Sequence, residues 1–388
     1  MTATATGGAS AGGAGVRLGG PASTAVPLSA LKARVDHELS VFARDETALL
    51  EAIDPELKPL GDQLRSIVSR GKRLRAAFCY WGWRAAGRDD GDDVVRAAAA
   101  MELVHAAAVV HDDIIDHSAV RHGLPTAHRA LAPPRKHWPA GPGRAGAGRA
   151  SAGRALALLT GDLLISWAGQ LFTECGLPSA YLNRARPLWA TLARELVAGE
   201  CLEVLRTRPG VDDAADPGDS LQIVRYKTAK YTVEHPLHIG ALLGGAPPAL
   251  LETFTAYGVP LGEAFQLRDD LLGVFGAPDS TGKSNLDDID GARPTVLLAL
   301  MKQLATEAER RELRLLLERR PGAGAERLDR FRELAERTGA RREVEDLIAA
   351  RAEAAAEVVD AALVAGRLAP HVAAALHELA RHCLARAA

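Results

Sequence analysis

Three aspartates, Asp112, Asp113 and Asp116, end an apolar stretch of the sequence that begins at Met101. At 3.6 residues per turn, Asp112 and Asp116 lie one above the other on one face of a helix, with Asp113 beside them. Carboxylates this close repel each other, so the cluster is costly unless cations neutralise it. Because Mg²⁺ prefers carboxylates, waters and substrate phosphates as ligands, the spacing indicates a magnesium–diphosphate site. A solvated acidic helix end is the alternative that this cluster alone leaves open.

A second acidic pair, Asp269 and Asp270, occurs far downstream within another apolar run, Phe265 to Gly273. Gly273 stands where a third aspartate would complete the same pattern. Two helices that face each other with such pairs could hold a group of Mg²⁺ ions against one diphosphate. Both pairs are flanked by core-like residues, which argues against two unrelated exposed acidic pairs.

In this order and spacing, the two clusters resemble the first and second aspartate-rich motifs of trans-isoprenyl diphosphate synthases, the polyprenyl synthetase family. The segment from Arg121 to Thr126 adds to the similarity, which covers roughly residues 30–385. The resemblance implies an all-α fold, a single large helical bundle of the isoprenoid synthase type around a central cavity. It also implies a Mg²⁺-dependent prenyltransferase that joins isopentenyl diphosphate head-to-tail to an allylic diphosphate, and a homodimer.

The resemblance assigns site residues by position. The metal ligands that it implies are Asp112, Asp116 and Asp269. The catalytic residues that it implies are Asp112, Asp113, Asp116, Asp269, Asp270, Lys227, Thr228 and Gln266. The substrate-binding residues that it implies are Lys72, Arg75, His105, Arg121, His122, Lys227, Thr228, Gln266, Lys283 and Arg293.

The residues themselves support part of this assignment. Gly71 is followed by three cations at the start of an apolar run, where backbone N–H groups and side-chain charge can converge on a phosphate. An ordinary basic helix start explains the same pattern. His105 lies two helical turns before Asp112 on roughly the same face, although a single histidine on an apolar helix is usually a core residue.

The sequence also gives an indication of the length of the product. In the resembled family, the residues four and five positions before the first aspartate form the floor beneath the growing chain. Here these are Ala108 and Ala107, which are small. One helical turn is about 5.4 Å, roughly the length of one five-carbon unit, so small residues leave room for a longer chain. We expect geranylgeranyl diphosphate, with farnesyl or a longer polyprenyl diphosphate as alternatives.

The composition agrees with helices as the elements that position these residues. Hydrophobic residues make up 47% of the 388 residues but aromatic residues only 4%, so Ala, Leu and Val must fill the core. Such residues suit closely packed helices better than a sheet. We expect a disordered tail over residues 1–26, one synthase domain over 27–388, and a flexible Gly/Pro/Arg insertion at about 133–154.

Composition also narrows the function classes. The net charge is −2, and no basic stripe suggests a nucleic-acid partner. The four cysteines are widely spaced, and the N-terminus lacks a signal-peptide pattern, so we expect a cytoplasmic protein. The longest apolar run, Ala155 to Phe172, is interrupted by Gly161 and Asp162, which favours a buried helix over a membrane span.

Two other functions fit parts of the sequence. A class I terpene cyclase shares the fold and the first acidic cluster, but usually carries an Asn/Ser/Glu metal triad in place of the second aspartate pair. It also lacks the cationic segment from Gly71 to Arg75. A non-catalytic subunit of a heteromeric synthase is compatible with two departures from the family pattern, His122 and Gly273.

His122 stands where a second arginine normally follows Arg121 in the family. A neutral imidazole offers one donor and is charged only part of the time near neutral pH, so it cannot replace a guanidinium fork. We therefore expect His122→Arg to lower the KM for isopentenyl diphosphate, more at pH 8 than at pH 6. Steady-state kinetics at both pH values test this, and an unchanged KM would contradict it.

Overall fold

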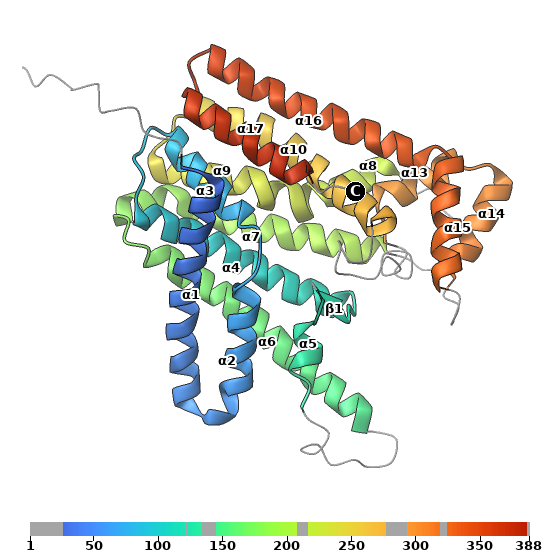
Figure 1. The fold of residues 1–388 in the computed structure, drawn as a ribbon, viewed down its shortest axis with the longest axis horizontal. Helices are drawn as coiled ribbons and strands as arrows, with labels where there is room; N and C mark the ends of the chain where they lie inside the picture. Colours follow the sequence, from blue (N-terminus) through green and yellow to red (C-terminus); the bar gives the residue numbers. More distant parts are fainter. Residues whose placement is uncertain are drawn as a thin grey trace, which may run out of the picture.

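The computed structural model describes residues 26–121, 123–133, 145–207, 216–276, 293–318 and 324–385, and for residues 145–147 only the backbone. Long helices dominate the described residues, and the predicted all-α class is confirmed. Most of them lie at shallow angles across one another, while α1 (Leu28–Ile53) and α2 (Lys58–Val68) form a hairpin that extends from one side (Figure 1).

The first half of the chain supplies the helices around the first acidic cluster. They are joined by the short helix η1 (Pro55–Leu57) and by a two-stranded antiparallel hairpin, in which Arg121 pairs with Leu124. The remaining elements of this half are α3 (Leu74–Ala85), α4 (Asp92–Ile115), β1 (Val120–Arg121), β2 (Leu124–Pro125), α5 (Ala127–Ala130), α6 (Ala145–Thr173) and α7 (Ser179–Arg206).

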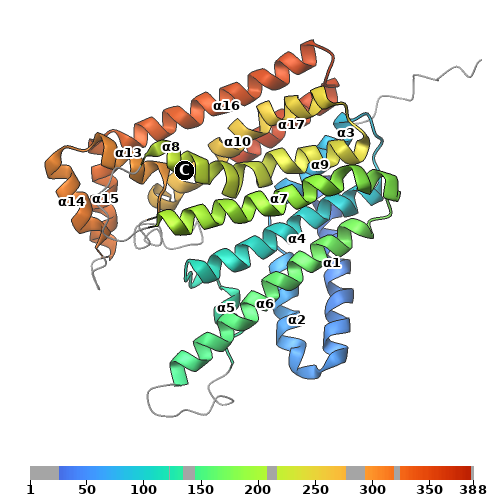
Figure 2. The same cartoon turned by 180° about the vertical axis from the view of Figure 1, so that it is seen from behind.

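The second half completes the bundle and adds C-terminal helices, some at one end of it and the last two along one side (Figures 1 and 2). Its elements are α8 (Pro217–Ile223), η3 (Val224–Glu234), α9 (His235–Gly244), α10 (Pro248–Phe275), α13 (Val296–Leu304), α14 (Glu307–Leu317), α15 (Gly324–Arg337), α16 (Ala340–Val364) and α17 (Pro370–Leu384).

The core is built from small residues that let helices approach closely. Helix α4 contributes a fully buried run of four alanines, 97–100. Helices α3 and α9 cross with their backbones in contact, because a Cβ atom on Gly82 would overlap the Leu237 carbonyl and one on Gly240 would overlap the Cys79 carbonyl. This close packing lies beside buried aromatic residues of α3, among them Phe78, Tyr80 and Trp81.

The segment η3 is a π-helix between α7 and α10. Glycines on both neighbours allow its backbone to approach: a Cβ on Gly199 would overlap Lys227, and one on Gly262 would overlap Ala229. π-Helical turns are rare and concentrate at functional sites. Here the widened helix carries Lys227 and Thr228, two of the residues that the sequence singles out.

The predicted flexible insertion at 133–154 is wrong over its last part, because α6 begins at Ala145. Alanine and arginine are good helix formers, and the glycine that argued for a loop has a packing role. A Cβ on Gly153 would overlap the carbonyl of His128, so this glycine lets α6 pack against α5. The predicted N-terminal tail lies outside the described residues, apart from residue 26.

By length and composition alone, α4 and residues 148–173 of α6 could cross a membrane. In α4, 72% of the apolar window is buried inside the protein, as expected for a core helix of a soluble protein. The corresponding window of α6 is only 44% buried, so part of its apolar surface faces outward.

Candidate active site

The candidate site forms where the C-terminal ends of two helices meet the π-helix. Asp112 and Asp113 lie in the last turn of α4 and Asp116 follows it, while Glu203 lies in the last turn of α7. The C-terminal end of a helix carries a partial negative charge, which adds to the repulsion between these carboxylates. The arrangement therefore depends on nearby cations.

Lys227 supplies the first of these cations. Its Nζ lies 2.9 Å from Asp112 and 3.0 Å from Glu200, and it also contacts Glu203. Burial lowers the pKa of Lys227, but the charges of these three carboxylates have the larger combined effect and raise it well above its ordinary value. The lysine therefore stays charged at neutral pH.

The same three carboxylates form a group that could hold a metal ion, because their oxygen atoms lie within 4.8 Å of one another. Glu200 Oε1 is buried and has no hydrogen-bond partner among the described residues. Burial raises the pKa of Glu200, and Lys227 opposes this increase. An oxygen-only donor set with an unsatisfied buried oxygen suits a hard cation such as Mg²⁺, which would share these carboxylates with the Lys227 ammonium.

Asp116 links the first acidic cluster to Arg293, which lies in the segment after the second acidic pair. Its carboxylate lies 2.7 Å from Nη2 of Arg293, and Arg293 lines a small pocket together with Asp270 of α10. Burial, and then the charge of Asp112, raise the pKa of Asp116 to about 7, against the opposing effect of Arg293. This crowding is the repulsion that the sequence spacing predicts.

Arg121 closes the other side of the cluster. Its guanidinium donates to Asp113 at 2.8 Å and to Asp112 at 3.0 Å. The pairing of β1 with β2 brings this arginine back over the end of α4. Asp113 is consequently buried against Arg121, whereas Asp112 also reaches Lys227.

The second acidic pair lies on α10, half-buried at both positions. Gln266, one turn earlier, donates to Asp270 at 2.7 Å, as the helical spacing predicts. Thr228 is buried in η3 beside Lys227. Two further predicted residues, His122 and Lys283, lie outside the described residues.

The predicted phosphate grip of α3 meets the π-helix through Tyr231. Arg75 is buried and donates to the Tyr231 hydroxyl at 2.6 Å and to Thr232 at 2.8 Å, and its guanidinium lies 4.3 Å from the centre of the Tyr231 ring. His105 Nδ1 lies 3.2 Å from the same hydroxyl. Lys72 is exposed at the start of this segment. The structure therefore brings Arg75 and His105 together.

Sequence reasoning missed three residues of this site: Glu200, Glu203 and Tyr231. The sequence does contain a signal for the two glutamates. They lie about one helical turn apart in a mainly apolar segment, as Asp112 and Asp116 do. Tyr231 lies four residues after Lys227, and nothing in the sequence alone relates it to Arg75.

The predicted floor residues lie in the middle of α4. Ala107 is buried, and Ala108 is half-buried one turn before Asp112. Val104 is half-buried and Met101 is buried, on the turns below. A larger side chain at Ala108 would thus project from the face of α4 that carries Asp112.

The dependence of the carboxylates on Lys227 can be tested directly. Lys227→Met keeps a similar volume but leaves Asp112, Glu200 and Glu203 without their common cation. We expect the free energy of unfolding in EDTA to fall by roughly 3 kcal/mol, as for other broken buried ion pairs, and Mg²⁺ to restore part of it. Urea denaturation followed by circular dichroism, with and without Mg²⁺, measures both effects.

Lys58→Met is the matched control, because Lys58 is exposed and its partner Asp62 lies 3.6 Å away. We expect this control to stay within about 0.5 kcal/mol of the wild type. A Lys227→Met protein with wild-type stability in EDTA would show that the carboxylates do not need this ammonium group.

The chain is similar to known proteins in sequence and in fold. The family model for polyprenyl synthetases matches residues 58–334. The crystal structure of a geranylgeranyl pyrophosphate synthase from Corynebacterium glutamicum, complexed with isoprenyl diphosphate and magnesium, is similar with a TM-score of 0.82 and 31% identity. That similarity covers 93% of this chain and 100% of the other.

Curated relatives are similar over a smaller part of their length. The (2E,6E)-farnesyl diphosphate synthase of Mycobacterium tuberculosis is 29% identical over 260 residues, which is 64% of either chain. The geranylgeranyl diphosphate synthase of Saccharolobus solfataricus is 28% identical over 246 residues, 63% of this chain and 66% of the relative. The family model covers more than half of the chain, and the Corynebacterium structure matches nearly all of it. The chain therefore belongs to the polyprenyl synthetase family.

Proposed function

We propose that this protein is a trans-prenyltransferase, which condenses isopentenyl diphosphate head-to-tail with an allylic diphosphate. The observation that carries the proposal is the group of Asp112, Glu200 and Glu203 around Lys227, next to Asp116 and Arg293. Membership of the polyprenyl synthetase family supports it.

Magnesium is the proposed cofactor, with Asp112, Asp116 and Asp269 as its ligands. The unsatisfied oxygen of Glu200 makes that glutamate a further candidate, directly or through a water. When bound, magnesium neutralises the negative charge that grows on the departing diphosphate.

The cations of the site hold the allylic diphosphate in this proposal. Arg121, Lys227 and Arg293 are fixed by the carboxylates before substrate arrives, so they need little rearrangement when the leaving group develops charge. Lys283, Thr228 and Gln266 are further proposed contacts. We propose that the departing diphosphate accepts the proton lost in the final step.

Isopentenyl diphosphate binds, in this proposal, at Lys72, Arg75 and His105, with His122 as a weaker contact. Arg75 and His105 both contact the Tyr231 hydroxyl, which holds them toward a common point. Tyr231 lies on the same π-helix as Lys227. The two diphosphate sites are thus linked through one segment of backbone.

The proposed product is geranylgeranyl diphosphate. Small residues at 107 and 108 leave α4 without a bulky side chain at the predicted floor, and the half-buried Val104 follows one turn deeper. Relatives that make farnesyl or geranylgeranyl diphosphate are similar at nearly equal identity. The proposal for chain length therefore depends on Ala107 and Ala108 rather than on the comparisons.

The test of this function is an assay of the purified protein alone with labelled isopentenyl diphosphate, Mg²⁺ and dimethylallyl, geranyl or farnesyl diphosphate in turn. We expect elongation to geranylgeranyl diphosphate and no product in EDTA. A protein that elongates no primer would contradict the proposal and favour a subunit of a heteromeric enzyme.

In the same assay, Ala108→Phe should shorten the main product by at least one five-carbon unit, because the ring would fill about one helical turn of the space beneath the primer. Ala361→Phe, on an exposed position of α16, is the matched control and should leave the product unchanged. An unaltered product in Ala108→Phe would place the floor elsewhere.

A homodimer in the cytoplasm is the proposed form of the protein. Large apolar side chains remain exposed on α6 and α7, which lie on the same side of the molecule in Figure 2. They are Leu158, Leu159, Ile165, Val197, Val204 and Leu205. Burial of such a face against a second copy would remove it from water.

We expect a sedimentation velocity experiment to give the mass of two chains, and Leu159→Glu with Val197→Glu to give that of one. Leu315→Glu, at an exposed apolar position of α14, is the control and should leave the mass unchanged. A wild-type monomer at micromolar concentration would contradict the dimer.

A further inference from the structure

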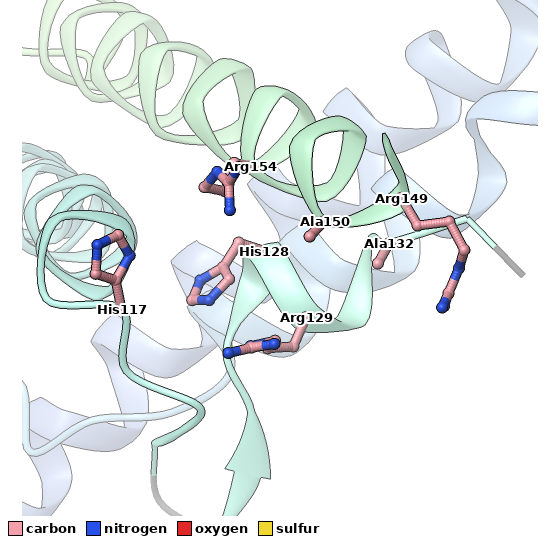
Figure 3. A pocket seen from close by; sticks show the side chains of 7 residues that line it. All are labelled: His117, His128, Arg129, Ala132, Arg149, Ala150 and Arg154. Atoms are coloured by element: carbon pink, nitrogen blue, oxygen red, sulfur yellow. The ribbon is translucent and has the colours of Figure 1, made fainter. Parts of the chain in front are cut away.

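A basic cavity lies outside the acidic site, between α5, the first turns of α6 and the residue after Asp116. Its volume is about 300 Å³, at the lower end of the range for small-molecule sites. Figure 3 shows His128 in the middle, with Arg129, Arg154 and His117 around it and Arg149 at the far end. The lining residues are His117, His128, Arg129, Ala132, Arg149, Ala150 and Arg154.

The cavity gathers several cations. Among the described residues, no carboxylate lines it and none forms an ion pair with Arg129, Arg149 or Arg154. Arg149 is held in place because its Nε donates to the Pro133 carbonyl at 2.6 Å. Guanidinium groups gathered in this way repel each other unless an anion joins them.

The local sequence gives a second, independent indication. Residues 117–161 contain seven arginines and lysines and neither aspartate nor glutamate, although the whole chain has 49 acidic and 47 basic residues. This segment therefore cannot neutralise its own charge. The cavity borders the second and third turns of α6 through Arg149, Ala150 and Arg154.

His128 experiences the same excess of positive charge. It is buried, and its Nδ1 lies 3.3 Å from the Thr126 hydroxyl. Burial, and then the charge of Arg129, hold the pKa of His128 below its ordinary value, although Asp113 opposes them. The ring can accept or donate one hydrogen bond in the cavity without adding a fixed charge.

We infer that this cavity is a second anion site, which binds a diphosphate group, free or at the end of a prenyl chain, without a metal ion. Guanidinium forks match phosphate oxygens with paired hydrogen bonds, and two or three of them suit a multiply charged anion better than a single carboxylate. His117 follows Asp116 directly, so a bound anion would lie next to the first acidic cluster without sharing its cations.

The test uses isothermal titration calorimetry of the full-length protein in EDTA, without substrate turnover, so its outcome does not depend on the proposed synthase activity. Sodium diphosphate and geranyl diphosphate are titrated separately. We expect one equivalent to bind at the cavity, in addition to the diphosphate that binds at the proposed isopentenyl diphosphate site. Tighter binding of sodium diphosphate would identify the free anion as the ligand, and tighter binding of geranyl diphosphate would identify the esterified group.

Two different variants should remove this binding. Arg129→Gln with Arg154→Gln alters two exposed side chains, so the protein should fold, and we expect the affinity to fall roughly tenfold or more. Ala150→Trp fills the cavity without changing its charge and should have the same effect. Circular dichroism melting curves verify the fold of each variant.

Two controls separate this cavity from the rest of the protein. Arg342→Gln with Arg330→Gln removes the same charge from exposed positions elsewhere and should leave the affinity unchanged. Lys72→Met weakens diphosphate binding at the proposed isopentenyl diphosphate site, and the binding event that this variant keeps but both cavity variants lose belongs to the cavity. No binding in EDTA, or equal binding by the wild type and both cavity variants, would overturn the inference.

Discussion

Repulsion between buried carboxylates is the constraint on which the rest of the site depends. Asp112, Asp116 and Glu203 lie at or near the negative ends of two helices, and burial together with the charge of Asp112 disfavours the charged form of Asp116. Lys227 and Arg293 offset part of this cost. The arrangement is stable because cations are built into it, and the same cations can serve an anionic substrate.

Close backbone packing decides where those cations lie. Gly199 and Gly262 let the π-helix come within contact distance of α7 and α10, and this places Lys227 among carboxylates from two helices. The same segment carries Tyr231, which joins Arg75 to His105. A π-helix has more residues per turn than an α-helix. In a regular α-helix, Lys227 and Tyr231 would point in different relative directions, so the π-helical geometry matters to both proposed diphosphate sites.

Charge is distributed unevenly along the chain. Carboxylates gather at the ends of α4 and α7, whereas the segment that follows Asp116 carries only basic charges up to Asp162. The carboxylates need cations to offset their charge, whereas the basic segment needs anions. The two lie next to each other because the basic segment begins directly after Asp116. We regard this contrast as the feature that separates the metal-dependent site from the proposed metal-free one.

The sequence alone determined the helical class, the two aspartate clusters and the family resemblance, because these depend on residue spacing within single elements. Gln266 and Asp270 form a hydrogen bond because they lie one turn apart on one helix. Only the tertiary structure joined Glu200, Glu203 and Tyr231 to the site, and it showed that residues 145–154 are helical. These features depend on contacts between elements far apart in the chain, such as Gly153 against His128, and local periodicity carries no information about such contacts.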